Sequence, residues 1–261
     1  MNRRTFIAGA SASTLLAALP GSGGSDAHRI RSLRLATSTA LGEMKRFYQE
    51  TMELTVLAES RDELTIAAGA TAITFFASAP EQGAPFYHFA FNIPENKILA
   101  ARDWQLERTP LIPPWESLRD PDLPDEVVDF RHWNAHSVFF WDPAGNLLEH
   151  IARHELGNAA SGPFTSGDVL YASEIGLVVD DVPAVAARLR ETFGLATYVE
   201  GSEQFTPVGD AHGLLLVMKR GRNLGFGEGR PGGVFPTAAG LRASKEARFA
   251  LPDFPYEVTA A

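Results

Sequence analysis

FFWDPAGNLLE, residues 139–149, is the most informative stretch of the sequence. Its aromatic start suits a β-strand, and the DPAG that follows is a strong turn signal because aspartate, proline and glycine each favour turn conformations. The apolar residues after the turn predict a second strand, which carries Glu149. We therefore expect a β-hairpin with one acidic side chain on its return strand.

Around this hairpin the chain weakly repeats one pattern, which is a strand, a helix and then three short strands. We expect this βαβββ pattern over residues 28–80, again over residues 81–157 and a third time over residues 170–220. Residues 221–261 are rich in glycine and proline and predict no more than edge strands of an incomplete fourth repeat. The predicted organisation is a row of small α+β modules.

The spacing of apolar residues predicts where two of the helices lie. Residues 43–53 place Phe47 and Tyr48 on one side of a helix in the first module. In the third module Pro183 suits the first turn of a helix, and Gly194 suits its end. Both modules therefore contain one helix with an apolar face.

A long connection, residues 110–130, interrupts the second module. It contains five prolines and many acidic residues, so a regular helix is excluded and the segment is expected at the surface. Connections of this length in a compact domain are usually functional. We expect this one to be mobile and to cover one end of a ligand cleft.

The composition limits the kinds of partner. The formal net charge is −9, which argues against nucleic acid or an anionic membrane as the main partner. The sequence contains no cysteine, so disulfides, thiolate metal sites and cysteine nucleophiles are excluded. Any bound metal must therefore have nitrogen and oxygen ligands from histidine and carboxylate side chains.

Residues 1–27 are expected to be an export signal. Arg3 and Arg4 precede a modestly apolar run over residues 6–19, which is too short to span a bilayer comfortably. The paired arginines resemble a twin-arginine export signal, and small residues precede a predicted cleavage point near Ala27. We therefore expect a periplasmic or secreted bacterial protein with no stable membrane insertion after cleavage.

Three stretches together resemble one superfamily. The hairpin over residues 139–149 looks like a "YFxDPxGNxxE" motif, and residues 47–54 and 189–195 both look like the end of a module helix. These features resemble the vicinal-oxygen-chelate superfamily, which includes glyoxalase I, bleomycin-resistance proteins and extradiol dioxygenases. The resemblance covers roughly residues 30–220 and implies a glyoxalase-like α+β fold. In this fold, paired βαβββ modules form a half-open barrel with a metal site in its concave face.

The resemblance also implies a pair of metal ligands in the second module. A module of this superfamily donates one ligand from its first strand and one from its last, and His88 and Glu149 occupy these positions. Strand alternation supports this assignment, because His88 and Asn92 share one face while Phe89 and Phe91 share the other. Asn92 is therefore expected to contact substrate.

His136 is the third predicted ligand and is also a candidate acid–base catalyst, because its ordinary pKa is near neutrality. If the hairpin centres between residues 143 and 144, Val138 lies opposite Glu149, and His136 then looks into the cleft. Two histidines and one carboxylate would match the ligand set of non-haem iron oxygenases. The alternatives are that Glu174 completes the set, or that water molecules fill the remaining positions.

The other modules depart from the superfamily pattern. The first has Leu33 or Arg34 where a ligand would stand, and the third has Glu174 on its first strand but Leu216 on its last. A four-ligand site of the glyoxalase I kind is therefore not expected. Imidazole and carboxylate ligands together suit Fe²⁺, Mn²⁺, Zn²⁺ or Ni²⁺.

Two functions remain open. The first is a metal-dependent enzyme acting on a small oxygen-bearing substrate, either a ring-cleaving dioxygenase or a glyoxalase-type lyase, with Trp133 and Phe140 as aromatic substrate contacts. The alternative is a metal-free protein that binds or sequesters a small molecule, as bleomycin-resistance proteins do. We expect the third module to pair either within the chain or across a homodimer.

Overall fold

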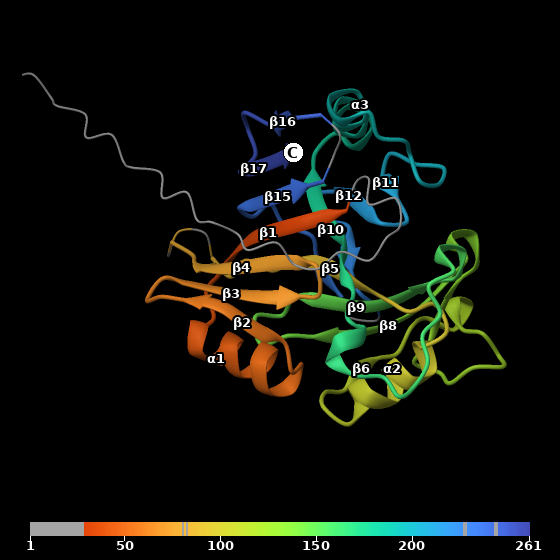
Figure 1. Ribbon diagram of the computed structural model, residues 1–261. Coiled ribbons are helices and arrows are strands. Elements are labelled where there is room, and N and C mark those ends of the chain that lie inside the picture. The colour runs from red at the N-terminus through yellow and green to blue at the C-terminus, as the bar shows by residue number, and fades with distance from the viewer. Residues whose placement is uncertain (1–28, 80, 82, 227–228, 243–244) are drawn as a thin grey trace, which may run out of the picture.

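The structure is a computed structural model that describes residues 29–261, except for 80, 82, 227–228 and 243–244. The predicted export segment, residues 1–27, lies outside the described residues. Within the described part of the chain, no helix is both long and apolar enough to span a bilayer. Two large mixed sheets and three α-helices dominate the architecture (Figure 1). Neither sheet closes on itself, so the predicted α+β class with a half-open arrangement is confirmed.

The first sheet combines the first module with the C-terminal tail, in the order β16-β17-β15-β1-β4-β3-β2. Its strands are β1 (Ile30–Thr37), β2 (Thr55–Glu59), β3 (Glu63–Ala68), β4 (Thr71–Ala77), β15 (Thr237–Leu241), β16 (Ala247–Ala250) and β17 (Tyr256–Ala260). The sequence predicts only edge strands for the tail, whereas β15 pairs directly with β1 inside the sheet. The β15 sequence TAAGL has little strand propensity of its own, so its pairing partners determine its conformation.

The second sheet combines the second and third modules, in the order β11-β12-β10-β5-β9-β8-β6, with β7 also paired to β8. Its strands are β5 (His88–Ile93), β6 (Leu111–Ile112), β7 (Val128–Phe130), β8 (Ala135–Trp141), β9 (Leu147–Arg153), β10 (Tyr171–Val179), β11 (Phe205–Asp210) and β12 (Gly213–Lys219). Strands β5 and β10 pair antiparallel at its centre. The third module therefore finds its partner within the chain, and a homodimer stays a prediction. A short ribbon of β13 (Asn223–Leu224) and β14 (Arg230–Pro231) follows the sheet.

Each α-helix belongs to one of the three modules, and α3 has a clear cap at both ends. α1 (Leu41–Lys45) continues into the π-helix η1 (Arg46–Thr51), close to the predicted range, and α2 (Ile98–Leu106) belongs to the second module. α3 (Val182–Phe193) begins after Asp181, whose carboxylate accepts a hydrogen bond from a backbone N–H of the first turn. It ends at Gly194, where φ is 68° and glycine has no Cβ to clash. The apolar faces of the helices share one buried core with both sheets.

Buried polar bonds join the two sheets. The Tyr48 hydroxyl, from η1, donates to the buried Asp142 carboxylate at 2.7 Å. The Tyr87 hydroxyl donates to the Pro236 carbonyl at 2.8 Å and accepts the Ala36 N–H at 3.0 Å. Each bond connects a residue of the second module to a residue of the first module or the tail, so these bonds help to hold the two sheets together.

The hairpin of β8 and β9 has a register that differs by one residue from the prediction. Phe139, not its neighbour Val138, lies opposite Glu149. The loop spans residues 142–146 and centres on Ala144, because the Asp142 carboxylate accepts backbone N–H groups of Ala144 and Asn146 and closes an odd-numbered turn. A shift of one residue sends every side chain of a strand to the opposite face.

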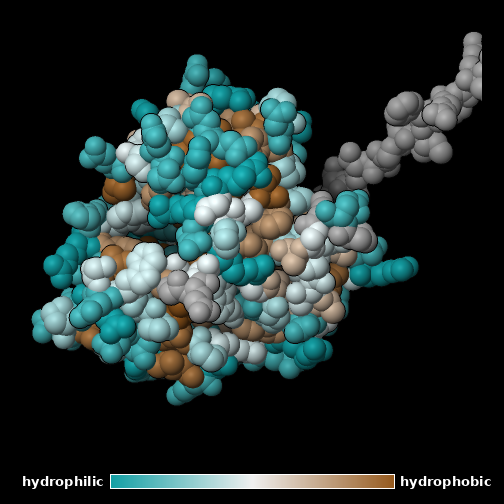
Figure 2. Space-filling view, turned by 180° about the vertical axis from the view of Figure 1, so that it is seen from behind, coloured by the Kyte–Doolittle hydropathy of each residue, from teal (hydrophilic) through white to brown (hydrophobic). Residues whose placement is uncertain are grey.

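The molecular face in Figure 2 is mainly hydrophilic, and its apolar side chains occur in small separate groups. This distribution agrees with the acidic composition and with a core that holds most of the large apolar side chains.

Candidate metal centre

Three neighbouring strands bring one histidine and two glutamates together. Ala90, in the middle of β5, pairs with Glu149 of β9 on one side and with Glu174 of β10 on the other. Paired residues point to the same face of a sheet, and so does His88, which lies two residues before Ala90. All three side chains are almost completely buried.

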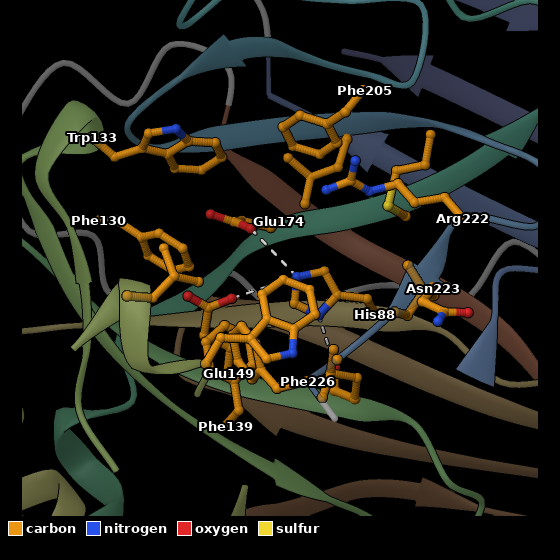
Figure 3. A pocket seen from close by; sticks show the side chains of 17 residues that line it. His88, Phe130, Trp133, Phe139, Glu149, Glu174, Phe205, Arg222, Asn223 and Phe226 are labelled. Carbon is orange, nitrogen blue, oxygen red and sulfur yellow. Dashed lines mark hydrogen bonds and ion pairs between the residues drawn. The ribbon is translucent and has the colours of Figure 1, made fainter. Parts of the chain in front are cut away.

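The geometry of the three side chains suits a shared ion. The Nε2 atom of His88 lies 3.4 Å from an oxygen of Glu149 and 3.7 Å from an oxygen of Glu174, and Figure 3 shows the three groups converging. Two ligand atoms, each about 2.1 Å from one ion, stand roughly 3.4 Å apart at the tetrahedral angle. The predicted approach of His88 and Glu149 is therefore present in the structure, and Glu174 joins them.

His88 is held in the orientation that a ligand needs. Its Nδ1 atom lies 3.0 Å from the carbonyl oxygen of Leu147, at the start of β9. An N–H on Nδ1 can donate to this carbonyl, which leaves the lone pair of Nε2 directed at the two carboxylates. A histidine that binds metal usually donates its other ring N–H in this way.

Burial perturbs the ionisation of the site. Burial raises the pKa of Glu149 to about 8, and the nearby carboxylate of Glu174 adds to this effect. Burial alone would lower the pKa of His88, but the Glu174 and Glu149 carboxylates more than offset it and raise that pKa. The site therefore holds protons that a divalent cation would displace.

Arg153 adds a buried positive charge beside the three residues. It is completely buried, and its guanidinium forms an ion pair with one oxygen of Glu174. The other oxygen of Glu174 faces His88. The guanidinium also lies over the Trp133 and Tyr198 rings, at 5.4 and 5.3 Å from their centres. Arg153 therefore fixes the orientation of Glu174 and neutralises part of the negative charge.

The residues present fit a divalent cation with three protein ligands. Oε1 of Glu149 is buried and has no hydrogen-bond partner among the described residues, so a buried carboxylate has unused binding capacity. Leu216 of β12 lines the same cavity at the position equivalent to Glu149 in the third module, and it offers no ligand atom. The site would leave several coordination positions for water or substrate.

The three candidate ligands lie in the wall of a cavity of about 270 Å³. Much of the remaining wall is aromatic, and the rings come from the sheet, the loops and the tail: Trp115, Phe130, Trp133, Phe139, Phe205 and Phe226. The Arg222 guanidinium points into this cavity in Figure 3. It lies 5.1 Å from the centre of the Phe205 ring and has no carboxylate partner among the described residues.

The long connection contributes side chains to the cavity wall. It contains the short 3₁₀ helix η3 (Glu116–Leu118), and both Trp115 and Leu118 line the cavity wall. Trp115 packs edge-on against Phe226 at 5.4 Å between ring centres. The mobility of the long connection stays a prediction.

The prediction for His136 is wrong. Phe139 and Glu149 share one face of the sheet. Because of the one-residue shift in the hairpin, His136 points to the opposite face. Its Nδ1 atom lies 2.8 Å from Nε2 of His154, and burial lowers its pKa. It is therefore neither a ligand of the candidate centre nor an acid–base group for a substrate bound there.

The predicted substrate contacts have mixed outcomes. Trp133 lines the cavity. Phe140 does not, because the same register shift turns it into the core, where its ring centre lies 5.0 Å from that of His150. Phe139 takes its place in the cavity wall. Asn92 shares the face of His88 but lies outside the cavity lining, where its amide donates to the Tyr171 hydroxyl at 3.0 Å.

Sequence reasoning missed Arg153 and Arg222, and it ranked Glu174 only as an alternative ligand. Arg153 lies four residues after Glu149, so strand alternation alone places both on the cleft face. The approach of Arg222 depends on how the tail folds over β12, and no local pattern indicates it.

Comparisons with known proteins identify the fold. No family model matches the chain, and no curated protein sequence matches it. Among solved structures, the chain is similar to a candidate dioxygenase from Bacillus subtilis, with a TM-score of 0.56, 15% identity and coverage of 91% of this chain and 86% of the other. It is also similar to glyoxalase I from Zea mays, with a TM-score of 0.51, 13% identity and coverage of 90% and 92%. The chain therefore has a glyoxalase-like α+β fold.

Proposed function

We propose that this chain is a metal-dependent enzyme that acts on a small substrate with two adjacent oxygen atoms. The observation that carries this proposal is the convergence of His88, Glu149 and Glu174 in the wall of a largely aromatic cavity. A divalent ion bound there would polarise adjacent substrate oxygens or, as iron or manganese, support reaction with O₂. The similarity in fold to a candidate dioxygenase and to glyoxalase I agrees with this proposal.

The cavity favours an aromatic substrate that carries a negative charge. Its volume of about 270 Å³ suits a molecule with a single ring, and its aromatic walls offer stacking surfaces. Arg222 supplies a guanidinium with no carboxylate partner among the described residues, whereas Arg153 is already paired with Glu174. We infer that Arg222 binds a carboxylate or a similar group of the substrate.

A ring-cleaving dioxygenase is our first choice of reaction and a glyoxalase-type lyase our second. Three protein ligands leave up to three positions of a six-coordinate ion open, enough for two substrate oxygens and one further small molecule. Leu216 removes the fourth ligand that the glyoxalase I arrangement would need. The set of one histidine and two carboxylates differs from the two-histidine set expected from the sequence, so both reactions must be assayed.

One observation favours the alternative of a metal-free binding protein. Arg153 already places a positive charge against Glu174, and the raised pKa of Glu149, about 8, lets that carboxyl hold a proton near neutral pH. The site can therefore reach near-neutrality without a metal. In that state the aromatic cavity could still bind and sequester a small molecule.

Metal analysis of protein purified without chelator tests the proposal directly. We expect a bound first-row metal, and we expect Glu149→Gln to lower the affinity of the cavity site for it more than about 100-fold. Removal of a group that only hydrogen-bonds to a metal ligand already lowers metal affinity about 10- to 100-fold. The matched control is Glu63→Gln, which removes a half-exposed carboxylate of the first sheet.

Activity assays then follow oxygen consumption with aromatic 1,2-diols and isomerisation of a hemithioacetal. Unchanged metal affinity in Glu149→Gln would contradict the enzyme proposal. Tight binding of an aromatic carboxylate by metal-free protein would support the alternative.

A further inference from the structure

A second group of metal-ligand side chains lies away from the cavity, where the long connection meets β8. Asp120 comes from the connection, Asp129 from β7 and His136 from β8. Asp129 and His136 pair directly across the two antiparallel strands, so their side chains share one face. One donor atom from each of the three residues lies within 4.8 Å of the others.

Both aspartates use one oxygen for a local contact and turn the other toward His136. Asp120 accepts the backbone N–H of Asp122 at 2.9 Å, and Asp129 accepts the Arg131 guanidinium at 2.6 Å. Their remaining oxygens each lie 3.9 Å from Nε2 of His136. This separation is too long for a hydrogen bond, and Nε2 is buried with no hydrogen-bond partner among the described residues.

His154 orients the ring of His136 for binding through Nε2. The Nδ1 atom of His136 lies 2.8 Å from Nε2 of His154. An N–H on Nδ1 of His136 can donate to His154, and the lone pair of His136 is then on Nε2. This is the outer hydrogen bond that metal-binding histidines usually make.

We propose that Asp120, Asp129 and His136 form a second divalent-cation site, which ties the long connection to the sheet. One imidazole nitrogen and two carboxylate oxygens suit Zn²⁺ or Mn²⁺. The distances of 3.9 Å exceed the roughly 3.4 Å of a tetrahedral pair of ligands, so binding requires side-chain shifts of a few tenths of an ångström. The two negative charges would balance the charge of the ion.

The site would act on the cavity without contacting it. Asp120 lies two residues after Leu118, and Trp115 and Leu118 form part of the cavity wall. Asp129 precedes Phe130, which also lines the cavity. An ion at the second site would hold these side chains in place, because it joins the segment that carries them to β8.

Zinc titration of protein stripped of metal by a chelator tests the proposal. We expect two Zn²⁺ per chain in the wild type and one in each of His136→Gln and Asp129→Asn. Glu149→Gln should also bind one, at the second site only. The exposed His132, four residues before His136, provides the matched control, and His132→Gln should bind two.

Hydrogen exchange gives a second readout in the Glu149→Gln background, where only the second site can fill. Zn²⁺ should slow exchange of backbone amides between residues 115 and 127, and adding His136→Gln should abolish this effect. The proposal is overturned if His136→Gln and Asp129→Asn bind zinc as the His132→Gln control does. If the cavity site binds no zinc, the pattern differs. The wild type and Glu149→Gln then each bind one Zn²⁺, and His136→Gln binds none.

Discussion

Replacing Arg153 with methionine should destabilise the metal-free protein by about 3–5 kcal/mol, because it leaves a buried carboxylate without its partner. Arg153 is 0% exposed and Glu174 is 2% exposed, so the substitution removes the charged partner of a buried carboxylate. Methionine fills much of the space of the arginine stem, so most of the effect comes from the charge and little from a cavity.

The assay is urea unfolding in the presence of a chelator, followed by tryptophan fluorescence and circular dichroism. Arg34→Met is the control, because Arg34 and Glu63 form a pair in which both side chains are about half exposed, and its loss should cost less than about 1 kcal/mol. The double variant Arg153→Met with Glu174→Met should recover most of the lost stability, since a buried ion pair and a packed apolar pair are often equally stable.

The pH dependence gives an independent check. The Arg153 guanidinium stabilises the fold only where the buried carboxyl group opposite it carries a charge, and carboxyl groups gain charge as the pH rises. The deficit relative to the wild type should therefore be larger at pH 8 than at pH 5. A loss no greater than that of Arg34→Met, or a double variant as unstable as the two single losses added together, would refute the reasoning.

Three further predictions concern other parts of the chain. Arg222→Met should weaken binding of aromatic carboxylates roughly 10- to 100-fold, as measured by calorimetry, while the exposed Arg220→Met should leave it unchanged. Burial lowers the pKa of His150 to about 3, so below about pH 6.5 the unfolded chain binds a proton that the folded chain does not, and stability decreases as the pH is lowered. In acid unfolding, His150→Gln should reduce the slope of stability against pH by about 1.4 kcal/mol per pH unit. An unchanged slope would contradict the lowered pKa of His150. Replacing Arg3 and Arg4 with lysine should retain the precursor inside the cell in a fractionation assay, whereas normal export would exclude the twin-arginine interpretation.

Local patterns, together with the family resemblance that they support, predicted the fold class and two of the three candidate ligands. The turn chemistry of residues 142–146 indicated the hairpin, and strand alternation placed His88 on the polar face of β5. Glu149 followed from its position on the return strand. These features depend on neighbours in the sequence, which a sequence pattern records directly.

The rest of the site depends on contacts between distant segments. The faces of His136 and Phe140 were mispredicted because the Asp142 carboxylate closes a five-residue loop, and sequence spacing does not distinguish this loop from a shorter one. Glu174 approaches His88 because β5 pairs antiparallel with β10, and these two strands lie about 80 residues apart in the sequence. Local propensities carry no information about that pairing.

The hydrogen bond between Tyr48 and Asp142 and the apolar core shared by both sheets couple the two halves of the chain. A fragment of residues 81–220 would contain every ligand of the candidate centre. Without Tyr48, however, the buried turn that leads into β9 would lose its hydroxyl donor, and the apolar surface shared with the first sheet would face water. The first sheet thus supports the second sheet, which has the candidate ligands. We therefore expect a chain without residues 29–80 to lose stability, although the first sheet has no ligand set of its own among the described residues.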